Sequence, residues 1–287
     1  MENVWMTRRV LCFAHQGGAH EGPSSTLFAI EQALAQGATA IELDVHQSAD
    51  GVLFVCHDAT IDRTSDAIGA IAEHSAAELA EVDNAYWFVP GRGAERGHAS
   101  SEYPFRGRAP SDERFRLAML ASVLEAHPGV PLNLDIKRTE PEVVPYEAEV
   151  AAMLGRYSRT NDVIVTSFSD HATRRFHDAA PDIGTAPGAS ALTMIVQSIR
   201  AGESVPHEVL EGHVALQVPS SIAGVRLIDD RLVGAAHELG LAVHVWTVDD
   251  EQEMDQLVEL GVDGIMTDVP SVLATVLRRT GTTARVN

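Results

Sequence analysis

Cysteine is scarce in this chain, and its scarcity excludes one class of protein. Two cysteines, Cys12 and Cys56, occur among 287 residues, too few for the disulfide framework that holds small secreted domains together. Both lie inside short apolar segments, where a buried free thiol is commoner than a disulfide, although two thiols also permit one bridge. The chain must therefore be stabilised mainly by an apolar core.

Long apolar runs are also missing. The first residues, MENVWMTRRVLCFAH, contain no apolar segment of signal-peptide length after their charges. No run elsewhere is long enough to cross a bilayer. We therefore expect no transmembrane segment and a cytoplasmic location.

Positive charge is the third shortage. The 21 Lys and Arg residues are outnumbered by 41 Asp and Glu residues, which gives a formal net charge of −20. A nucleic acid would be repelled by this charge, and no cluster of basic residues offsets it. We expect no nucleic-acid partner. A small anionic substrate remains compatible with the charge, because a bound cation can reverse its sign locally.

What the chain does contain is a regular alternation of strand and helix patterns. From residue 8 onward about eight strand–helix units follow one another, the number that closes a TIM (β/α)8 barrel of the α/β class. An open doubly wound sheet is the alternative, but neither GxGxxG nor GxxxxGK[ST] is present. We predict one TIM-barrel domain over residues 1–280 and a disordered tail at 281–287.

One stretch, residues 59–116, interrupts the alternation. Its second half is rich in Gly, Arg, Ser and aromatic residues without clear periodicity. We interpret it as an insertion near the barrel mouth, because long irregular loops often serve function. The segment YWFVP at residues 86–90 either forms the lip of an apolar entrance or packs the insertion onto the barrel.

Polar residues end the early apolar runs RRVLCFAH, ATAIELDV, GVLFVCHD and VPLNLDIK. In a barrel, the carboxyl ends of the strands meet at one mouth, where chemistry takes place. We therefore expect the following residues to converge there: His15, Glu42, Asp44, His57, Asp135 and Lys137. Together they suggest a metal-assisted reaction on a phosphate ester.

The three acids favour a hard divalent cation. Glu42 and Asp44 share one face of their strand, and buried unpaired carboxylates are costly. Mg²⁺ or Ca²⁺ prefers such oxygen ligands, with Asp135 as a third. Lys137 can hold a phosphate oxygen. The alternative is a buried salt bridge between Lys137 and one acid, but a single pair leaves the other acids uncompensated.

Two histidines, His15 and His57, flank the acids. Imidazole titrates near neutrality, so one ring can deprotonate the attacking hydroxyl while the other protonates the leaving alkoxide. A single histidine in a chain with 13 of them would mean little. His244 and Trp246 share a face of the run AVHVWT, and Trp246 either packs on the organic part of a substrate or belongs to the core.

These residues resemble a known family. The patterns His15-Gln16-Gly17, Glu42-x-Asp44, His57-Asp58 and LNLDIK are similar to those of glycerophosphodiester phosphodiesterases. The resemblance, over residues 9–275, implies a TIM barrel and hydrolysis of glycerophosphodiesters to glycerol 3-phosphate and an alcohol. By position it implies acid–base roles for His15 and His57, divalent-metal ligands at Glu42, Asp44 and Asp135, and a phosphate contact at Lys137.

The chain departs from that family at three places. Gln16 stands where Arg is usual, which removes a charge and a bidentate donor for phosphate. The usual Pro-Glu-Asn-Thr appears as PSST, and the nearby Glu21, in a run that resembles the lysophospholipase D-like branch, is a candidate for the missing acid's role at the substrate. Asp135 stands where Glu is usual.

Three functions follow from this pattern. The first is a metal-dependent phosphodiesterase acting on glycerophosphodiesters, with Gln16, Glu21, Lys137 and Trp246 at the substrate. The second is a phospholipase D-like enzyme acting on lysophospholipids or sphingolipids. The third is an inactive barrel that only binds a phospho-ligand, which the retention of both histidines and all three acids disfavours. The sequence gives no oligomeric state.

Overall fold

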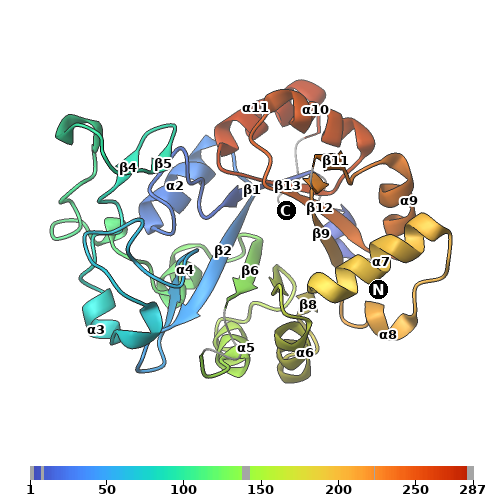
Figure 1. Cartoon of the computed structure of the whole chain (residues 1–287), viewed down its shortest axis with the longest axis horizontal. Helices are drawn as coiled ribbons and strands as arrows, with labels where there is room; N and C mark the ends of the chain where they lie inside the picture. Colours follow the sequence, from blue (N-terminus) through green and yellow to red (C-terminus); the bar gives the residue numbers. More distant parts are fainter. Residues whose placement is uncertain (1–2, 8–9, 138–142, 223, 283–287) are drawn as a thin grey trace.

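Eight parallel strands alternate with helices and curl into a nearly closed barrel (Figure 1). The computed structural model describes residues 3–7, 10–137, 143–222 and 224–282. Within them the strands pair in the order β8–β7–β6–β2–β1–β13–β12–β9, and a parallel bridge between Thr185 and His213 links the two ends. The barrel strands are β1 (Leu11–His15), β2 (Ala40–Gln47), β6 (Leu132–Ile136), β7 (Val163–Thr166), β8 (Gly184–Thr185), β9 (Ala215–Pro219), β12 (Ala242–Trp246) and β13 (Gly264–Thr267).

Helices surround the barrel and cover the outer faces of its strands. The first of them shows why the sequence folds this way: Thr26 accepts a hydrogen bond from the Ala29 amide at its start, and Gly37 ends it with φ of 111°. The helices are α2 (Leu27–Gln36), α4 (Leu120–Ala126), α5 (Glu147–Arg156), α6 (Asp170–Ala179), α7 (Ala189–Ala201), α8 (His207–Leu210), α9 (Asp230–Glu238), α10 (Glu251–Leu260) and α11 (Pro270–Thr280).

The inside of the barrel changes from apolar to polar along its axis. At the amino ends of the strands the interior is filled by apolar side chains such as Leu11, Phe13 and Ile164. Trp5, from the short helix α1 (Val4–Thr7), is buried against this cluster and closes that end. The carboxyl ends carry the polar side chains instead, so the site can form only at the opposite mouth.

The run at residues 52–56 differs from the sequence prediction. It forms β3 (Leu53–Val55), which pairs antiparallel with β2 and does not join the barrel. Because β2 extends beyond the mouth before the chain turns at Gly51, β3 brings His57 back to the mouth from outside. The Cys56 amide donates to the Asp44 carbonyl at 3.0 Å, which fixes this return.

The insertion lies beside α2 and α4 (Figure 1). It contains α3 (Ala76–Leu79), the two-stranded β4 (Phe88–Val89) and β5 (Gly93–Ala94), and 3-10 turns at Ile71–Glu73, Ser100–Glu102 and Glu113–Phe115. The Arg106 guanidinium lies over the rings of Tyr86, Trp87 and Tyr103, at 4.5, 4.5 and 3.7 Å from their centroids. The aromatic residues at 86–90 therefore organise the insertion itself.

Other sequence predictions can be checked against the same description. Cys12 and Cys56 are free and buried, as expected. Helix α11 runs to Thr280, and most of the predicted tail, from residue 283 on, lies outside the described residues. No helix in the described ranges is both long and apolar enough to cross a bilayer.

Candidate active site

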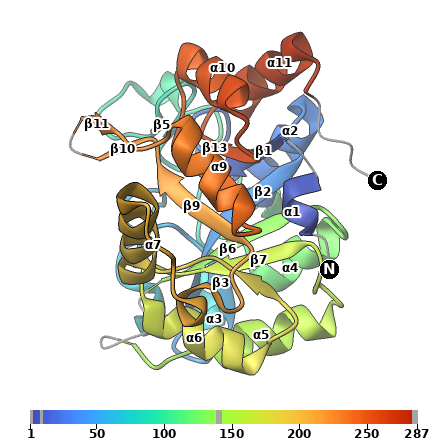
Figure 2. The same cartoon turned by 90° about the vertical axis from the view of Figure 1, so that its right-hand side faces the viewer.

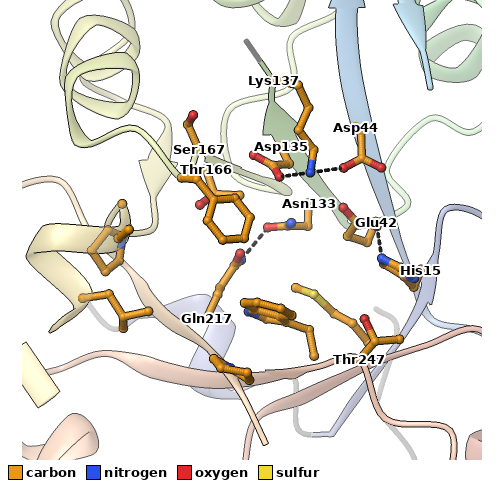
Figure 3. Close-up of a pocket in the computed structure, with 18 of the residues that line it drawn as sticks. His15, Glu42, Asp44, Asn133, Asp135, Lys137, Thr166, Ser167, Gln217 and Thr247 are labelled. Atoms are coloured by element: carbon orange, nitrogen blue, oxygen red, sulfur yellow. Dashed lines mark hydrogen bonds and ion pairs between the residues drawn. The ribbon is translucent and has the colours of Figure 1, made fainter. Parts of the chain in front are cut away.

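A cavity of about 490 Å³ opens at the carboxyl ends of the barrel strands. All six residues that the sequence placed at the mouth line it. Figure 3 shows His15, Glu42, Asp44, Asp135 and Lys137 around the cavity, with Gln217 across from His15 and Thr247 next to it. The convergence predicted from the strand ends is therefore present in the structure.

Asp44 and Asp135 are register partners on neighbouring strands β2 and β6. Lys137 bridges them, with its Nζ atom 2.9 Å from Asp44 Oδ1 and 2.8 Å from Asp135 Oδ2. Burial lowers the pKa of Lys137, but the two carboxylates outweigh it and hold that pKa above its usual value. The Tyr146 hydroxyl donates to the Lys137 carbonyl and fixes the backbone at this point.

Glu42 lies next to this trio and is almost fully buried. Its Oε2 accepts a hydrogen bond from the Gln16 amide at 3.1 Å and lies 3.8 Å from His15 Nε2. Burial and the neighbouring Asp44 carboxylate raise the pKa of Glu42 to about 8. Burial, and then the negative charge of Asp44, raises the pKa of Asp135 to about 6, although the Lys137 ammonium opposes this increase.

His15 is held by a carboxylate that the sequence analysis did not single out. Its Nδ1 atom lies 2.7 Å from Asp268 Oδ1, and a carboxylate can only accept, so Nδ1 carries the proton and Nε2 faces Glu42. Burial lowers the pKa of His15, but the Asp268 hydrogen bond and then Glu42 outweigh it and raise that pKa to about 9.

His57 is held in the same way. Its Nδ1 atom lies 2.7 Å from Asp58 Oδ1, and Arg63 donates to Asp58 Oδ2 at 2.6 Å. The hydrogen bond from His57 keeps the pKa of Asp58 below its usual value. The ring centroids of His15 and His57 are 6.2 Å apart. In each histidine an aspartate therefore holds Nδ1, which leaves Nε2 as the nitrogen that can exchange protons. In His15 this Nε2 atom lies 3.5 Å from Gln16 Nε2 and 3.8 Å from Glu42 Oε2.

The carboxylates have the properties that a divalent cation needs. Asp44 Oδ2 and Asp135 Oδ1 are buried and have no hydrogen-bond partner among the described residues, an arrangement that costs free energy unless a positive charge faces it. The donor set is all oxygen, which suits Mg²⁺ or Ca²⁺. The predicted ligands Glu42, Asp44 and Asp135 therefore fit such an ion.

A second group of possible ligands lies behind His15. His20, Asp249 and Asp268 each offer an atom within 4.8 Å of the others, the sole His/Cys/Asp/Glu group in the described ranges to meet that criterion. The predicted ligands Glu42, Asp44 and Asp135 do not meet this distance criterion. The Lys137 ammonium lies between the carboxylates of Asp44 and Asp135. The structure thus offers two candidate cation sites at one mouth.

The other predicted substrate contacts are placed differently. Trp246 lines the cavity, whereas Gln16 and Glu21 do not. The turn after β1 gives Gln16 a φ of 51° and buries its side chain. The Glu21 carboxylate accepts from the Ser271 amide at 3.1 Å and from its hydroxyl, so it caps α11.

Some lining residues were missed by the sequence analysis. Asn133 and Gln217 form a hydrogen bond across the barrel (Figure 3), and Phe168 lines the cavity from the loop after β7. Asp268 could have been found, because it follows the strand GIMT in the same way that the recognised acids end theirs.

This fold and this mouth define a TIM-barrel protein with a site for a phosphate ester. The chain belongs to the glycerophosphoryl diester phosphodiesterase family, whose profile matches residues 15–272. The family predicted from the sequence, and the class of enzyme with it, are confirmed.

Individual relatives support the same assignment. The chain is 26% identical over 277 residues to a glycerophosphodiester phosphodiesterase of Bacillus subtilis (strain 168), covering 94% of this chain and 87% of the relative. It is also 26% identical over 275 residues to one from Caldanaerobacter subterraneus, covering 95% and 100%.

Solved structures share the fold. A glycerophosphoryl diester phosphodiesterase domain from Mycobacterium tuberculosis has a TM-score of 0.74 at 18% identity and covers 94% of this chain and 99% of that one. An Oleispira antarctica phosphodiesterase, solved in complex with the product sn-glycerol-3-phosphate, has a TM-score of 0.70 at 22% identity and covers 96% and 99%. These likenesses confirm the barrel.

Proposed function

We propose that this protein hydrolyses glycerophosphodiesters to glycerol 3-phosphate and an alcohol, with two histidines as acid and base. The observation that carries the proposal is the pair His15 and His57, with rings 6.2 Å apart beside three buried carboxylates and one lysine. A phosphodiester needs this combination, because one proton must leave the nucleophile and another must reach the leaving alkoxide.

The protein's own groups divide the work. Asp268 and Asp58 fix the Nδ1 proton of each imidazole, so that the Nε2 atoms exchange protons with the substrate. One imidazole deprotonates the attacking hydroxyl, of water or of the substrate's glycerol, and the other protonates the departing alkoxide. The Lys137 ammonium stabilises negative charge on the phosphate oxygens.

Glu42, Asp44 and Asp135 would hold a divalent cation, which when bound would neutralise further charge on the phosphate. The same three carboxylates would otherwise face the phosphate and repel it. Lys137 alone cannot offset three buried acids, which is why the proposal includes Mg²⁺ or Ca²⁺.

The test combines product analysis with metal titration. A panel of glycerophosphodiesters is expected to yield glycerol 3-phosphate, to lose turnover in a chelator and to regain it with Mg²⁺ or Ca²⁺. Unchanged rates in the chelator would contradict the metal assignment. Ligand binding without turnover of any diester would instead favour an inactive phospho-ligand-binding barrel.

A matched pair of variants decides which carboxylates hold the ion. Asp44→Asn is expected to weaken calorimetric Mg²⁺ or Ca²⁺ binding, by roughly 10- to 100-fold or more, since outer-shell changes alone cost that much. Asp249→Asn, in the group with His20 and Asp268, is expected to leave that binding unchanged. The reverse result would move the cation site behind His15.

A further inference from the structure

The insertion contributes no side chain to the cavity. None of residues 59–116, all of which the structure describes, is among the lining residues. Figure 2 nevertheless shows β5 at the same end of the barrel as β10 (Ser221–Ile222) and β11 (Val225–Arg226), beyond the carboxyl ends of the strands. A segment placed in this way can influence the site through the residues that it contacts.

The insertion reaches the site first through Arg63. Its guanidinium donates from Nε to Asp58 Oδ2 at 2.6 Å and from Nη2 to Asp58 Oδ1 at 3.3 Å. Asp58 Oδ1 in turn lies 2.7 Å from His57 Nδ1. A guanidinium that contacts both oxygens fixes the plane of a carboxylate, which a single hydrogen bond from an imidazole does not. Arg63 therefore sets the direction in which Asp58 holds the His57 ring.

The hairpin of β4 and β5 holds the backbone on both sides of Arg63. The Arg96 guanidinium, just after β5, donates to the Asp62 carbonyl. The Trp87 amide, just before β4, donates to the Thr64 carbonyl at 3.3 Å. Arg96 Cζ also lies 4.7 Å from the centroid of the Trp87 ring, so both contacts belong to one packed unit. The position of Arg63 therefore depends on this hairpin.

The same hairpin contacts the turn that follows β1. The Gly91 amide, between β4 and β5, donates to the His20 carbonyl at 2.8 Å. Gly93 has a φ of 76°, and a Cβ atom there would lie 3.2 Å from the Ala19 carbonyl oxygen and 3.4 Å from the His20 ring. The hairpin is therefore packed closely against both the backbone and the ring of His20.

His20 lies directly behind the carboxylate that holds His15. Its amide donates to the Asp268 carbonyl at 3.1 Å, and its Nε2 atom lies 3.8 Å from Asp268 Oδ2. Its Nδ1 atom lies 3.8 Å from Asp249 Oδ2, while Asp249 Oδ1 accepts from the Asp268 amide at 2.8 Å. Asp268 Oδ1 lies 2.7 Å from His15 Nδ1. Behind each imidazole there is thus an aspartate whose other oxygen faces a basic side chain that belongs to the insertion or packs against it.

We propose that the insertion orients both catalytic histidines, with Arg63 and His20 as its positioning residues. The inference rests on the proposed phosphodiesterase function and gives a role to a segment that takes no part in the chemistry. His57 follows a strand outside the barrel and its side chain is 40% exposed, and His15 precedes residues 16–18, which all have positive φ. Neither ring is therefore fixed by the barrel alone. Placement matters, because a displacement of about 1 Å can cost on the order of 10²-fold in rate.

Alanine variants test the proposal on the glycerophosphodiester that the wild type hydrolyses fastest. Arg63→Ala and His20→Ala are each expected to lower kcat by roughly 10- to 100-fold and to leave KM within about twofold, because orientation matters in the transition state more than in binding. Arg92→Ala is the matched control, since Arg92 lies in the same hairpin and pairs with Glu95 at 3.6 Å rather than with either aspartate. Wild-type kcat in either variant, or an equal loss in the control, would overturn the proposal.

Double variants show whether each positioning residue acts through its histidine. Arg63→Ala should lower kcat no further in the His57→Ala protein, and His20→Ala no further in the His15→Ala protein. The reason is that a positioning residue loses its effect together with the ring that it positions. Losses that multiply in the double variants would show independent structural damage and would overturn the proposal.

Histidine NMR separates failure of this proposal from failure of the proposed function. The Nδ1 protons of His15 and His57, each held by an aspartate at 2.7 Å, should give two slowly exchanging downfield signals. Arg63→Ala should remove the His57 signal alone, and His20→Ala the His15 signal alone. Persistence of both signals in both variants would overturn the proposal. If the wild type hydrolyses no diester, the proposed function fails, and these signals still decide the orienting role.

Calorimetry distinguishes the orienting role of His20 from a cation site. His20, Asp249 and Asp268 lie close enough together to share an ion. If His20 positions Asp268, His20→Ala should bind Mg²⁺ or Ca²⁺ as tightly as the wild type. Weaker binding in this variant would make His20 a cation ligand and overturn its role as a positioning residue.

Discussion

The cavity has a charged wall, formed by its lining residues before residue 138, and an uncharged wall, formed by its lining residues from 166 onward. The two walls differ in how their side chains are held. On the charged wall, each histidine has an aspartate at 2.7 Å and Lys137 is fixed between two carboxylates. On the uncharged wall, Phe168 and Ile222 are more than half exposed. Catalysis needs groups held in place, whereas apolar binding depends on area and tolerates movement.

A barrel makes this division easy, because each strand ends in its own loop. The charged wall comes from β1, β2, β6 and the hairpin strand β3, and the uncharged wall comes from the segments around β7 to β13. Asp268, which follows β13, is the exception, because it holds His15 on the charged wall from the second half of the chain. The comparison shows that the first half of the chain supplies the ionisable lining of the cavity and the second half supplies its uncharged lining.

The largest expected effect tests the charged wall. His57→Ala should lower kcat for a glycerophosphodiester by roughly 10²–10⁴-fold, because one proton transfer loses its catalyst. Its side chain is 40% exposed, so the fold should be retained. Phe168→Ala should cost much less kcat on the same diester. Steady-state kinetics on both variants makes the comparison, and equal losses would show that the walls do not divide the work.

The next effect concerns the carboxylates and pH. The raised pKa values of Asp135, about 6, and Glu42, about 8, mean that the folded protein binds these protons more tightly than the unfolded chain. Their contribution to stability is therefore present below about pH 4 and is lost as the pH rises through 6 and then 8. A divalent cation would replace those protons.

Thermal unfolding with and without Mg²⁺ or Ca²⁺ checks this linkage. At pH 8, an ion at about 100 times its Kd should add roughly 2.7 kcal/mol to the free energy of unfolding. At pH 5 the same concentration should add little, because protons compete for Glu42 and Asp135. Glu42→Gln should reduce the difference between the two pH values. An equal gain at both would show that the ion binds elsewhere.

The sequence predicted the barrel and the charged wall because both follow from periodic patterns. Strand-ending acids and histidines can be recognised without knowing any contact, and Asp268 would have been found by the same rule. The run at 52–56 was recognised as a strand, but its direction was not, because an apolar strand looks the same in either direction. Only the short turn at residues 49–51 indicated the antiparallel hairpin.

Apart from Trp246, the uncharged wall could not be predicted in the same way. Phe168 and Ile222 lie in a loop and a small hairpin, where no periodicity tells an exposed apolar residue from a buried one. The aromatic residues of the insertion were conspicuous in the sequence, but the sequence did not show whether they are exposed or packed together. They allowed either the lip of an entrance or packing of the insertion, and in the structure their rings contact Arg106 and one another. Burial is a property of tertiary packing, which composition does not reveal.

The smallest expected effect concerns the barrel interior, where the second half of the chain also places an ionisable residue. His244 is fully buried, and neither ring nitrogen has a hydrogen-bond partner in the described part of the chain. Its ring packs 4.9 Å from that of Phe13. Burial lowers the pKa of His244 to about 3. The ring is therefore neutral at ordinary pH and acts as an apolar side chain.

The sign of this shift sets the pH range of the test. A lowered folded pKa contributes stability that is present above the unfolded value of about 6.5 and is lost as the pH falls from there toward 3. At pH 5 the loss should be about 2 kcal/mol relative to neutral pH, since each unit below 6.5 costs about 1.4 kcal/mol.

Denaturant unfolding of the wild type and of His244→Leu at both pH values isolates the contribution of His244 to this loss, because the other titratable groups titrate equally in the two proteins. The variant should lose about 2 kcal/mol less on acidification. Equal losses of stability in the two proteins would show that His244 accepts a proton inside the folded barrel. The second half of the chain would then place a charged group in the barrel interior beneath the cavity.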